Sequence, residues 1–111
     1  MREVRLLGSR GLVLRALVPE TRGERMRGLR GHPTLPADAA LLLDGTRSIH
    51  TFGMRFAIVA ALLDRDLVVR RARSIPPGRL LLPRPGIRHV LECAEGINVL
   101  PGDRLRIVAD G

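Results

Sequence analysis

The stretch IVAALLDRDLVVRRA, from Ile58 to Ala72, decides the fold class of this chain. Two largely apolar arms, 58–63 and 67–72, flank a charged turn at 64–66, which is the pattern of a β-hairpin. Elsewhere, glycine and proline divide the chain into pieces of similar length, and this favours strands over long helices. The sequence therefore predicts a mainly β protein.

Short strands are expected on both sides of this hairpin. Their ranges are 4–7, 12–18, 39–43, 87–93 and 104–108, and a turn at 8–11 joins the first two into another hairpin. Residues 75–86 contain four prolines, which cannot donate to a strand ladder, so an irregular arm is predicted there. Many short strands of this kind are typical of an antiparallel sandwich or a distorted barrel.

One short α-helix is predicted from Thr21 to the residue before Gly31. Thr21 and Glu24 have the spacing of a capping box, in which each side chain accepts a hydrogen bond from the backbone of the other. Met26 and Leu29, three residues apart, are expected to face inward. Gly31 is expected to end the helix.

Length and composition indicate a single domain spanning residues 1–111. A chain of this size buries roughly 60 to 70% of its unfolded surface, which is enough for a core without disulfides. The chain is 45% hydrophobic, and Phe52 and Phe56 are its only aromatic side chains. We therefore expect an aliphatic core in which each phenylalanine is a large part of the aromatic packing.

The chain is arginine-rich and basic, with a net charge of +8 and nineteen arginines but no lysine. A positive charge attracts phosphate, so nonspecific nucleic-acid binding through dispersed arginines is one interpretation. The arginines are spread along the chain, and little aromatic surface is available to stack bases. Nucleic acid is therefore the weakest of the partners that we consider.

The cellular setting is predicted from what the chain contains. Its single cysteine, Cys93, excludes an internal disulfide framework. The first eight residues lack the pattern of a signal peptide. The longest apolar run, 56–63, is far shorter than the roughly 20 residues that cross a bilayer. We therefore expect a cytoplasmic protein with no membrane partner.

Four short motifs follow one another along the chain. They are RMRGL at 25–29, HTFGM at 50–54, LE at 91–92 and GD at 102–103. On these motifs the chain resembles the family called domain of unknown function 192, small uncharacterised β domains of bacteria and archaea, and the resemblance spans residues 21–108, most of the chain. The resemblance implies the fold and leaves the activity open.

Val59 departs from the pattern of that family. The resemblance implies an aspartate at this position, so one carboxylate is missing here. Replacing a buried charge by an apolar group can be neutral for stability. Our hypothesis is that Val59 leaves the fold intact and removes a polar group from the site of the family.

The candidate ligand-binding residues are Arg25, His50, Thr51, Met54 and Glu92. His50 could shuttle a proton or donate to a ligand, or it could tie two strands together through a hydrogen bond. Glu92 lies among apolar residues and needs a partner, for which Arg25 or Arg47 is predicted. Such an ion pair could hold the fold together or belong to a site.

No metal or cofactor is predicted. His89 and Cys93 are four residues apart, but along a strand this separates them by about 13 Å, too far to share one ion. No zinc-binding spacing is present elsewhere. Cys93 is interpreted as a small core residue.

Two function classes follow from these residues. The first is a small binding module for a polar or anionic small molecule or a peptide end. The second is an enzyme that uses His50 as acid or base, with Glu92 orienting it. The sequence does not decide between them, and it leaves a protein partner and the oligomeric state open.

Overall fold

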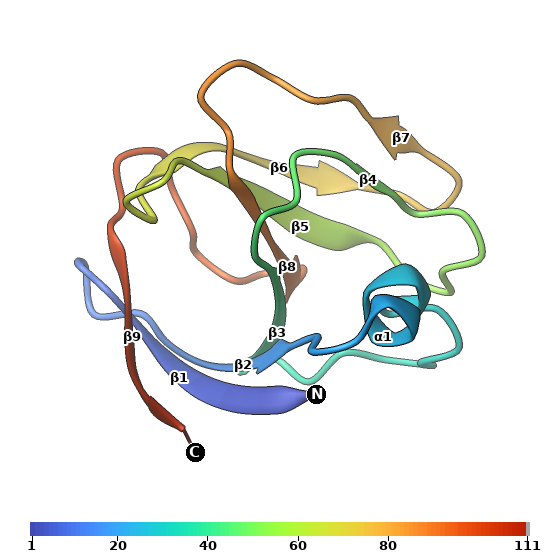
Figure 1. Cartoon of the computed structure of the whole chain (residues 1–111), viewed down its shortest axis with the longest axis horizontal. Coiled ribbons are helices and arrows are strands. Elements are labelled where there is room, and N and C mark those ends of the chain that lie inside the picture. The colour runs from blue at the N-terminus through green and yellow to red at the C-terminus, as the bar shows by residue number, and fades with distance from the viewer. Residues whose placement is uncertain (111) are drawn as a thin grey trace.

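The structure is a computed structural model that describes the backbone of residues 1–110 and the side chains of residues 1–108. One helix and nine strands make up the described chain (Figure 1). Their bounds are β1 Arg2–Gly8, β2 Val13–Val18, α1 Arg22–Arg27, β3 Ala39–Leu43, β4 Ile49–His50, β5 Ile58–Leu63, β6 Val69–Ile75, β7 Leu80–Leu81, β8 His89–Ala94 and β9 Leu105–Asp110.

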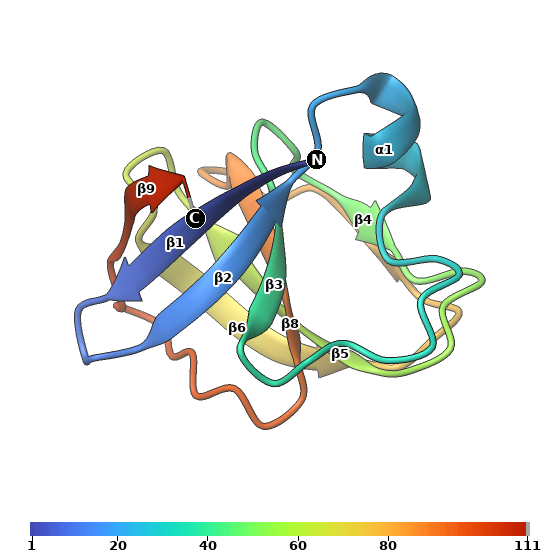
Figure 2. The same ribbon diagram turned by 90° about the horizontal axis from the view of Figure 1, so that it is seen from below.

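Seven strands form one sheet in the order β6-β5-β8-β3-β2-β1-β9, which curls into a half-barrel (Figure 2). The remaining two, β4 and β7, form a small second sheet. The predicted class, mainly β with one short helix, is confirmed, and of the two predicted arrangements, a sandwich or a distorted barrel, the curled sheet corresponds to the second. β2 and β3 are parallel, whereas all other pairs are antiparallel. A parallel pair needs a long crossover, and residues 19–38, which contain α1, provide it.

The two edges of the half-barrel meet at one end. Val68 and Arg104 form an antiparallel bridge. Beside it, the Val69 amide donates to the Asp103 carbonyl and the Gly102 amide donates to the Val69 carbonyl, both at 2.7 Å. The Asp103 carboxylate accepts from Arg10 Nε at 2.6 Å and from the Leu100 amide at 3.0 Å. These bonds fix the turn that closes the sheet.

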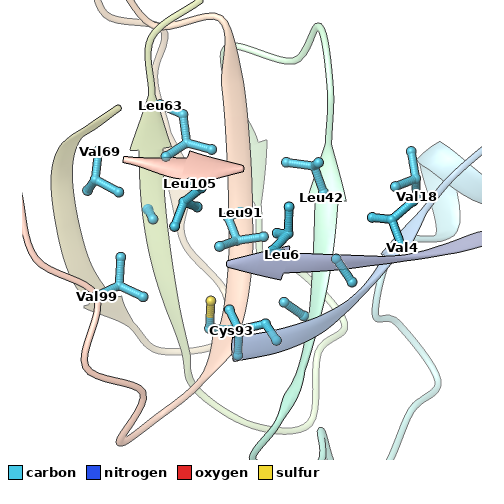
Figure 3. Close-up of a cluster of buried hydrophobic side chains, with 14 residues drawn as sticks. Val4, Leu6, Val18, Leu42, Leu63, Val69, Leu91, Cys93, Val99 and Leu105 are labelled. Atoms are coloured by element: carbon cyan, nitrogen blue, oxygen red, sulfur yellow. The ribbon is translucent and has the colours of Figure 1, made fainter. Parts of the chain in front are cut away.

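The inner core fills the curled sheet (Figure 3). It is aliphatic, as expected, and its buried members are Val4, Leu6, Leu14, Ala16, Val18, Ala40, Leu42, Ala61, Leu63, Val69, Leu91, Cys93, Val99 and Leu105. Burial raises the pKa of the Cys93 thiol to about 12, with a further contribution from Glu92, so Cys93 is an unreactive packing residue. Neither phenylalanine lies here: Phe52 is half exposed and Phe56 packs elsewhere.

A second, outer core covers the other face of β3, β5 and β8. Its buried members are Leu29, Leu41, Leu43, Ile49, Met54, Ile58, Ala60, Leu62, Ile75, Leu81, Ile87 and Val90. Because both faces of these central strands are covered, their sequences are continuously apolar instead of alternating. Along β8, Leu91 and Cys93 face the inner core, so Val90 and Glu92 face the outer one.

Helix α1 has the predicted capping box: the Glu24 amide donates to Thr21 Oγ1, and Glu24 Oε1 accepts from the Thr21 amide. It ends at Gly28, whose φ of 52° leaves the helical region, and not at Gly31. Leu29 is buried as expected, but the prediction for Met26 is wrong, because its side chain is 66% exposed. Because the last helical residue is Arg27, Met26 lies within the helix and Leu29 lies after it, so the two residues do not share a helical face.

None of the helices in the described residues is long and apolar enough to span a membrane.

Candidate functional site

A cavity of about 180 Å³ lies where α1, the turn after it and β4 cover the outer face of β8. In both views the helix and β4 lie on the same side of the curled sheet (Figure 1 and Figure 2). The lining residues include four of the five predicted ones, Arg25, His50, Met54 and Glu92. The structure does not bring the fifth, Thr51, into the lining.

Glu92 lies at the floor of this cavity, between Leu41 on β3 and Ala60 on β5. The Glu92 residue is only 4% exposed, and its side chain makes no hydrogen bond or ion pair among the described residues. Every fully enclosed side-chain nitrogen or oxygen of the described residues has a partner, so the unpartnered carboxyl must keep access to the cavity. Burial raises the pKa of Glu92 to about 7.

The predicted ion pair between Glu92 and Arg25 or Arg47 is therefore wrong. Arg25 instead donates from Nη1 to the Asp44 carbonyl at 2.6 Å and to Thr46 Oγ1 at 2.9 Å, and Nη2 reaches Asp44 Oδ1 at 3.3 Å. These bonds fasten α1 to the turn between β3 and β4. The guanidinium of Arg25 therefore bonds Asp44 and Thr46 and does not pair with the Glu92 carboxyl, which lines the cavity.

Two further arginines line the cavity, and the sequence interpretation did not include them. The Arg27 side chain makes no hydrogen bond or ion pair in the described residues, and the Arg30 guanidinium donates only one long hydrogen bond, 3.4 Å, to the Met26 carbonyl. The stem of Arg30 lies close to Gly53, whose φ is 79°: a Cβ there would sit 3.3 Å from Arg30 Cδ. The cavity thus has an arginine rim, Arg27 and Arg30, without an acidic partner.

His50 is an exposed residue of the lining, and its ring stacks on that of Phe52 with centroids 5.2 Å apart. Its side chain makes no hydrogen bond in the described residues, so the interpretation of a strand-tying hydrogen bond is wrong. The backbone makes that connection instead, where β4 pairs with β7. Glu92 does not hydrogen-bond His50 either, so it does not orient the imidazole in this structure.

Thr51 is completely buried and serves the loop instead of the cavity. Its hydroxyl donates to the Pro76 carbonyl at 2.7 Å and accepts from the Arg79 amide at 2.8 Å. The proline-containing arm is thereby tied to β4. Thr51 consequently holds in place the segment whose neighbouring residues, His50 and Met54, line the cavity.

Val59 does not belong to this site. It pairs with Cys93 across the sheet and packs against the inner core, on the face opposite Ala60 and Glu92. An aspartate at this position would not line the cavity. His89 is likewise engaged elsewhere, since its Nδ1 accepts from the Gly45 amide at 3.0 Å. Within the described residues, no three His, Cys, Asp or Glu side chains are grouped so that they could hold a metal.

The half-barrel and its cavity define a small, mainly β protein with an unpaired acidic group beneath a basic rim. The chain belongs to the DUF192 family, described as "Uncharacterized ACR", whose family model matches residues 5–107. The resemblance inferred from the sequence motifs is thus confirmed.

Two solved structures share the fold, each with a TM-score of 0.77. One is a proposed transcription regulator from Sinorhizobium meliloti 1021, 21% identical, with 96% of this chain and 92% of that chain covered. The other is a protein of unknown function from Novosphingobium aromaticivorans DSM 12444, 20% identical, with 94% and 83% covered. At this identity the similarity shows the fold alone. No curated protein matches the chain.

Proposed function

We propose that this protein is a binding module for a small polar ligand, held in the cavity between α1 and β8. The observation that carries the proposal is Glu92, a buried carboxyl that lines the cavity and has no side-chain partner among the described residues. Burying such a group without a hydrogen bond is unfavourable. A ligand that donates to it would remove this penalty, and a purely structural role would not need the group at all.

The size and walls of the cavity indicate the kind of ligand. Its volume of about 180 Å³ is below the roughly 300–1,000 Å³ that is usual for drug-sized ligands. It therefore suits a metabolite of a few heavy atoms, or the end of a peptide. Leu43, Ile49 and Met54 supply apolar walls, while Arg27 and Arg30 at the rim offer donors for an anionic group.

A thermal-shift screen tests the proposal. Purified protein is mixed with amino acids, organic acids, sugar acids, sugars and short peptides, and the melting temperature is compared between wild type, Glu92→Gln and Glu95→Gln. Glu95 is the matched control, since it is an exposed carboxylate just beyond β8 that bonds Ser74 outside the cavity. A ligand at a hundred times its Kd adds about 2.7 kcal/mol, a shift of several degrees for a domain of this size.

We expect at least one compound to stabilise wild type and Glu95→Gln but not Glu92→Gln. If no compound in any class shifts the melting temperature, or if Glu92→Gln responds like wild type, the cavity is not the site and the proposal fails.

An enzyme is the second candidate, because the pKa of Glu92, about 7, suits a general acid or base at neutral pH. Glu92 would be the proton-transferring group, and His50, which shares the cavity but does not contact Glu92, would act separately. Incubating each stabilising compound with the protein and following it by mass spectrometry separates the two functions. Turnover that is lost in Glu92→Gln indicates an enzyme, and an unchanged compound indicates a binding module.

A further inference from the structure

We infer that the ligand is a zwitterion: a primary ammonium group that meets Glu92 at the floor of the cavity, joined by a short apolar chain to an anionic group that meets Arg27 and Arg30 at the rim. This inference rests on the proposed function and narrows it to one chemical class.

The floor selects the ammonium end. Glu92 is flanked by the apolar side chains of Leu41 and Ala60, and no described residue donates to its carboxyl. A buried carboxylate is stabilised most by a charged donor, because a charge-assisted hydrogen bond is roughly twice as strong as a neutral one. An ammonium group offers three donors and the full opposite charge. A ligand hydroxyl offers one donor and no charge.

The rim selects the anionic end. A plain amine would have to pass Arg25, Arg27 and Arg30, whose positive charges repel it. Arg25 is neutralised in part by Asp44, but the other two have no acidic partner in the described residues. Their guanidinium groups are therefore available for a carboxylate, which arginine can bind through two parallel hydrogen bonds. A plain anion would be held at the rim and leave Glu92 unsatisfied.

The walls select the connecting chain. Leu43, Ile49 and Met54 line the cavity between the floor and the rim, so the middle of the ligand lies against apolar side chains. Methylene groups there gain about 0.8 kcal/mol each on leaving water, whereas polar atoms would lose hydrogen bonds. The small volume limits the ligand to a simple amino acid or a chain of similar length.

The test is a calorimetric titration at pH 8 with probes of matched length. γ-Aminobutyrate carries both charges, butylamine only the positive one, butyrate only the negative one, and γ-hydroxybutyrate replaces the ammonium with a hydroxyl. Glycine, leucine and ε-aminocaproate vary the spacing and the apolar part. Wild type is compared with Glu92→Gln, with the double variant Arg27→Gln, Arg30→Gln, and with Arg22→Gln. Arg22 is the matched control, since it lies on α1 outside the cavity.

We expect at least one of the four amino acids to bind wild type about tenfold or more tightly than the three single-charge or hydroxyl probes, which is the effect of one charge-assisted hydrogen bond. Glu92→Gln and the double arginine variant should each weaken that binding about tenfold or more, and Arg22→Gln should leave it unchanged.

Two results overturn the inference. If γ-hydroxybutyrate or butyrate binds as tightly as the amino acids and still needs Glu92, the ligand is not a zwitterion but the binding module stands. If none of the amino acids binds, or if they bind Glu92→Gln equally well, the zwitterion is excluded. The broader thermal-shift screen then decides separately whether the cavity binds anything.

Discussion

Glu92 places a carboxyl on a face of β8 whose neighbours on the adjacent strands are apolar. The positions beside it on β3 and β5 are Leu41 and Ala60, and its own face of β8 continues the outer core. An apolar side chain there would complete that core and remove a desolvated carboxyl. Local violations of this kind, retained at a cost in stability, are expected at functional sites.

The stability of the protein should fall between pH 5 and 8 because of Glu92. Its pKa is about 7 in the folded chain against an ordinary 4.5, so the folded state keeps a proton that the unfolded state has lost. This contribution is complete below pH 4.5 and is lost as the pH rises to about 7. Its size is on the order of 3 kcal/mol. Urea denaturation at pH 5 and pH 8 measures it.

Glu92→Gln should remove most of that difference, since glutamine does not titrate. An equally large fall in the variant would assign the pH dependence to another group and contradict the raised pKa. The carboxyls of Asp64 and Asp103 do not interfere, because their pKa values are lowered below the ordinary value and they titrate at more acidic pH.

Replacing Thr51 by valine should destabilise the protein by about 1–3 kcal/mol. The variant keeps the shape but leaves the Pro76 carbonyl and the Arg79 amide without their side-chain partner. Thr34→Val is the control, since Thr34 is exposed. Chemical denaturation compares the two, and equal midpoints would show that the Thr51 hydroxyl does not hold the arm.

At the scale of elements, the stability of α1 comes from its capping and from polar contacts of its side chains, and not from buried apolar residues. It has six residues, none of them buried, and isolated helices of that length are unstable in water. The capping box and the bonds from Arg25 to Asp44 and Thr46 hold it in place. Because α1 carries part of the cavity lining, its local stability determines whether the cavity keeps its shape.

Thr21→Ala should loosen α1 without unfolding the barrel. The loss of the cap lowers the stability of the helix by about 1 kcal/mol. We expect this loss to appear as faster hydrogen exchange at the amides of Glu24, Arg25 and Gly28. Amides of β5 and β8 should exchange as in wild type. Unchanged exchange in the helix would mean that the arginine contacts alone maintain it.

The elements that the sequence predicts well are those determined locally. Both hairpins, the buried strand at 39–43 and the capping box depend on neighbours within a few residues, and all of them are present. The pairing of β4 with β7 joins residues thirty apart through only two residues on each strand, and the sequence offers no signal for it. The parallel alignment of β2 and β3 is likewise decided by the packing of the whole sheet.

The candidate site was predicted only in part, because some of its contacts also depend on the tertiary structure. Motif resemblance placed Arg25, His50, Met54 and Glu92 together, and the structure brings all four to one cavity. The motif resemblance could not show whether Glu92 has a partner, since this depends on where the guanidinium of Arg25 is directed. Arg27 lay inside the motif at 25–29, but the motif alone did not mark it as a lining residue, and Arg30 reaches the cavity from the turn after α1.

At the scale of the whole molecule, the half-barrel depends on the turn before β9, where the edge strands β6 and β9 meet. Asp103 is 5% exposed and accepts hydrogen bonds from both Arg10 and the Leu100 amide, which links the β1–β2 turn to the turn before β9. The hydrogen bond from Arg10, followed by the Leu100 amide, lowers the pKa of Asp103 despite its burial.

Asp103→Asn should destabilise the protein by about 1–3 kcal/mol. The asparagine side chain has one acceptor oxygen in place of two, so it cannot accept from both Arg10 donors and from the Leu100 backbone N–H. Asp66→Asn is the matched control: Asp66 is exposed, and among the described residues its side chain has only a loose 3.9 Å contact to Arg65, of a kind that contributes about 0–1 kcal/mol. Thermal unfolding compares the two variants. Equal losses would show that the closure of the barrel does not depend on the carboxylate.

The parallel pairing of β2 with β3 has a consequence for how relatives can diverge. The crossover between these strands carries every arginine of the rim, whereas the carboxyl at the floor belongs to β8, far along the chain. The rim and the floor of the cavity therefore belong to two separate segments of the chain. An exchange of residues 19–38 between relatives would alter the charge at the entrance and leave the floor untouched, so the chemistry of the cavity can change by replacement of one surface segment.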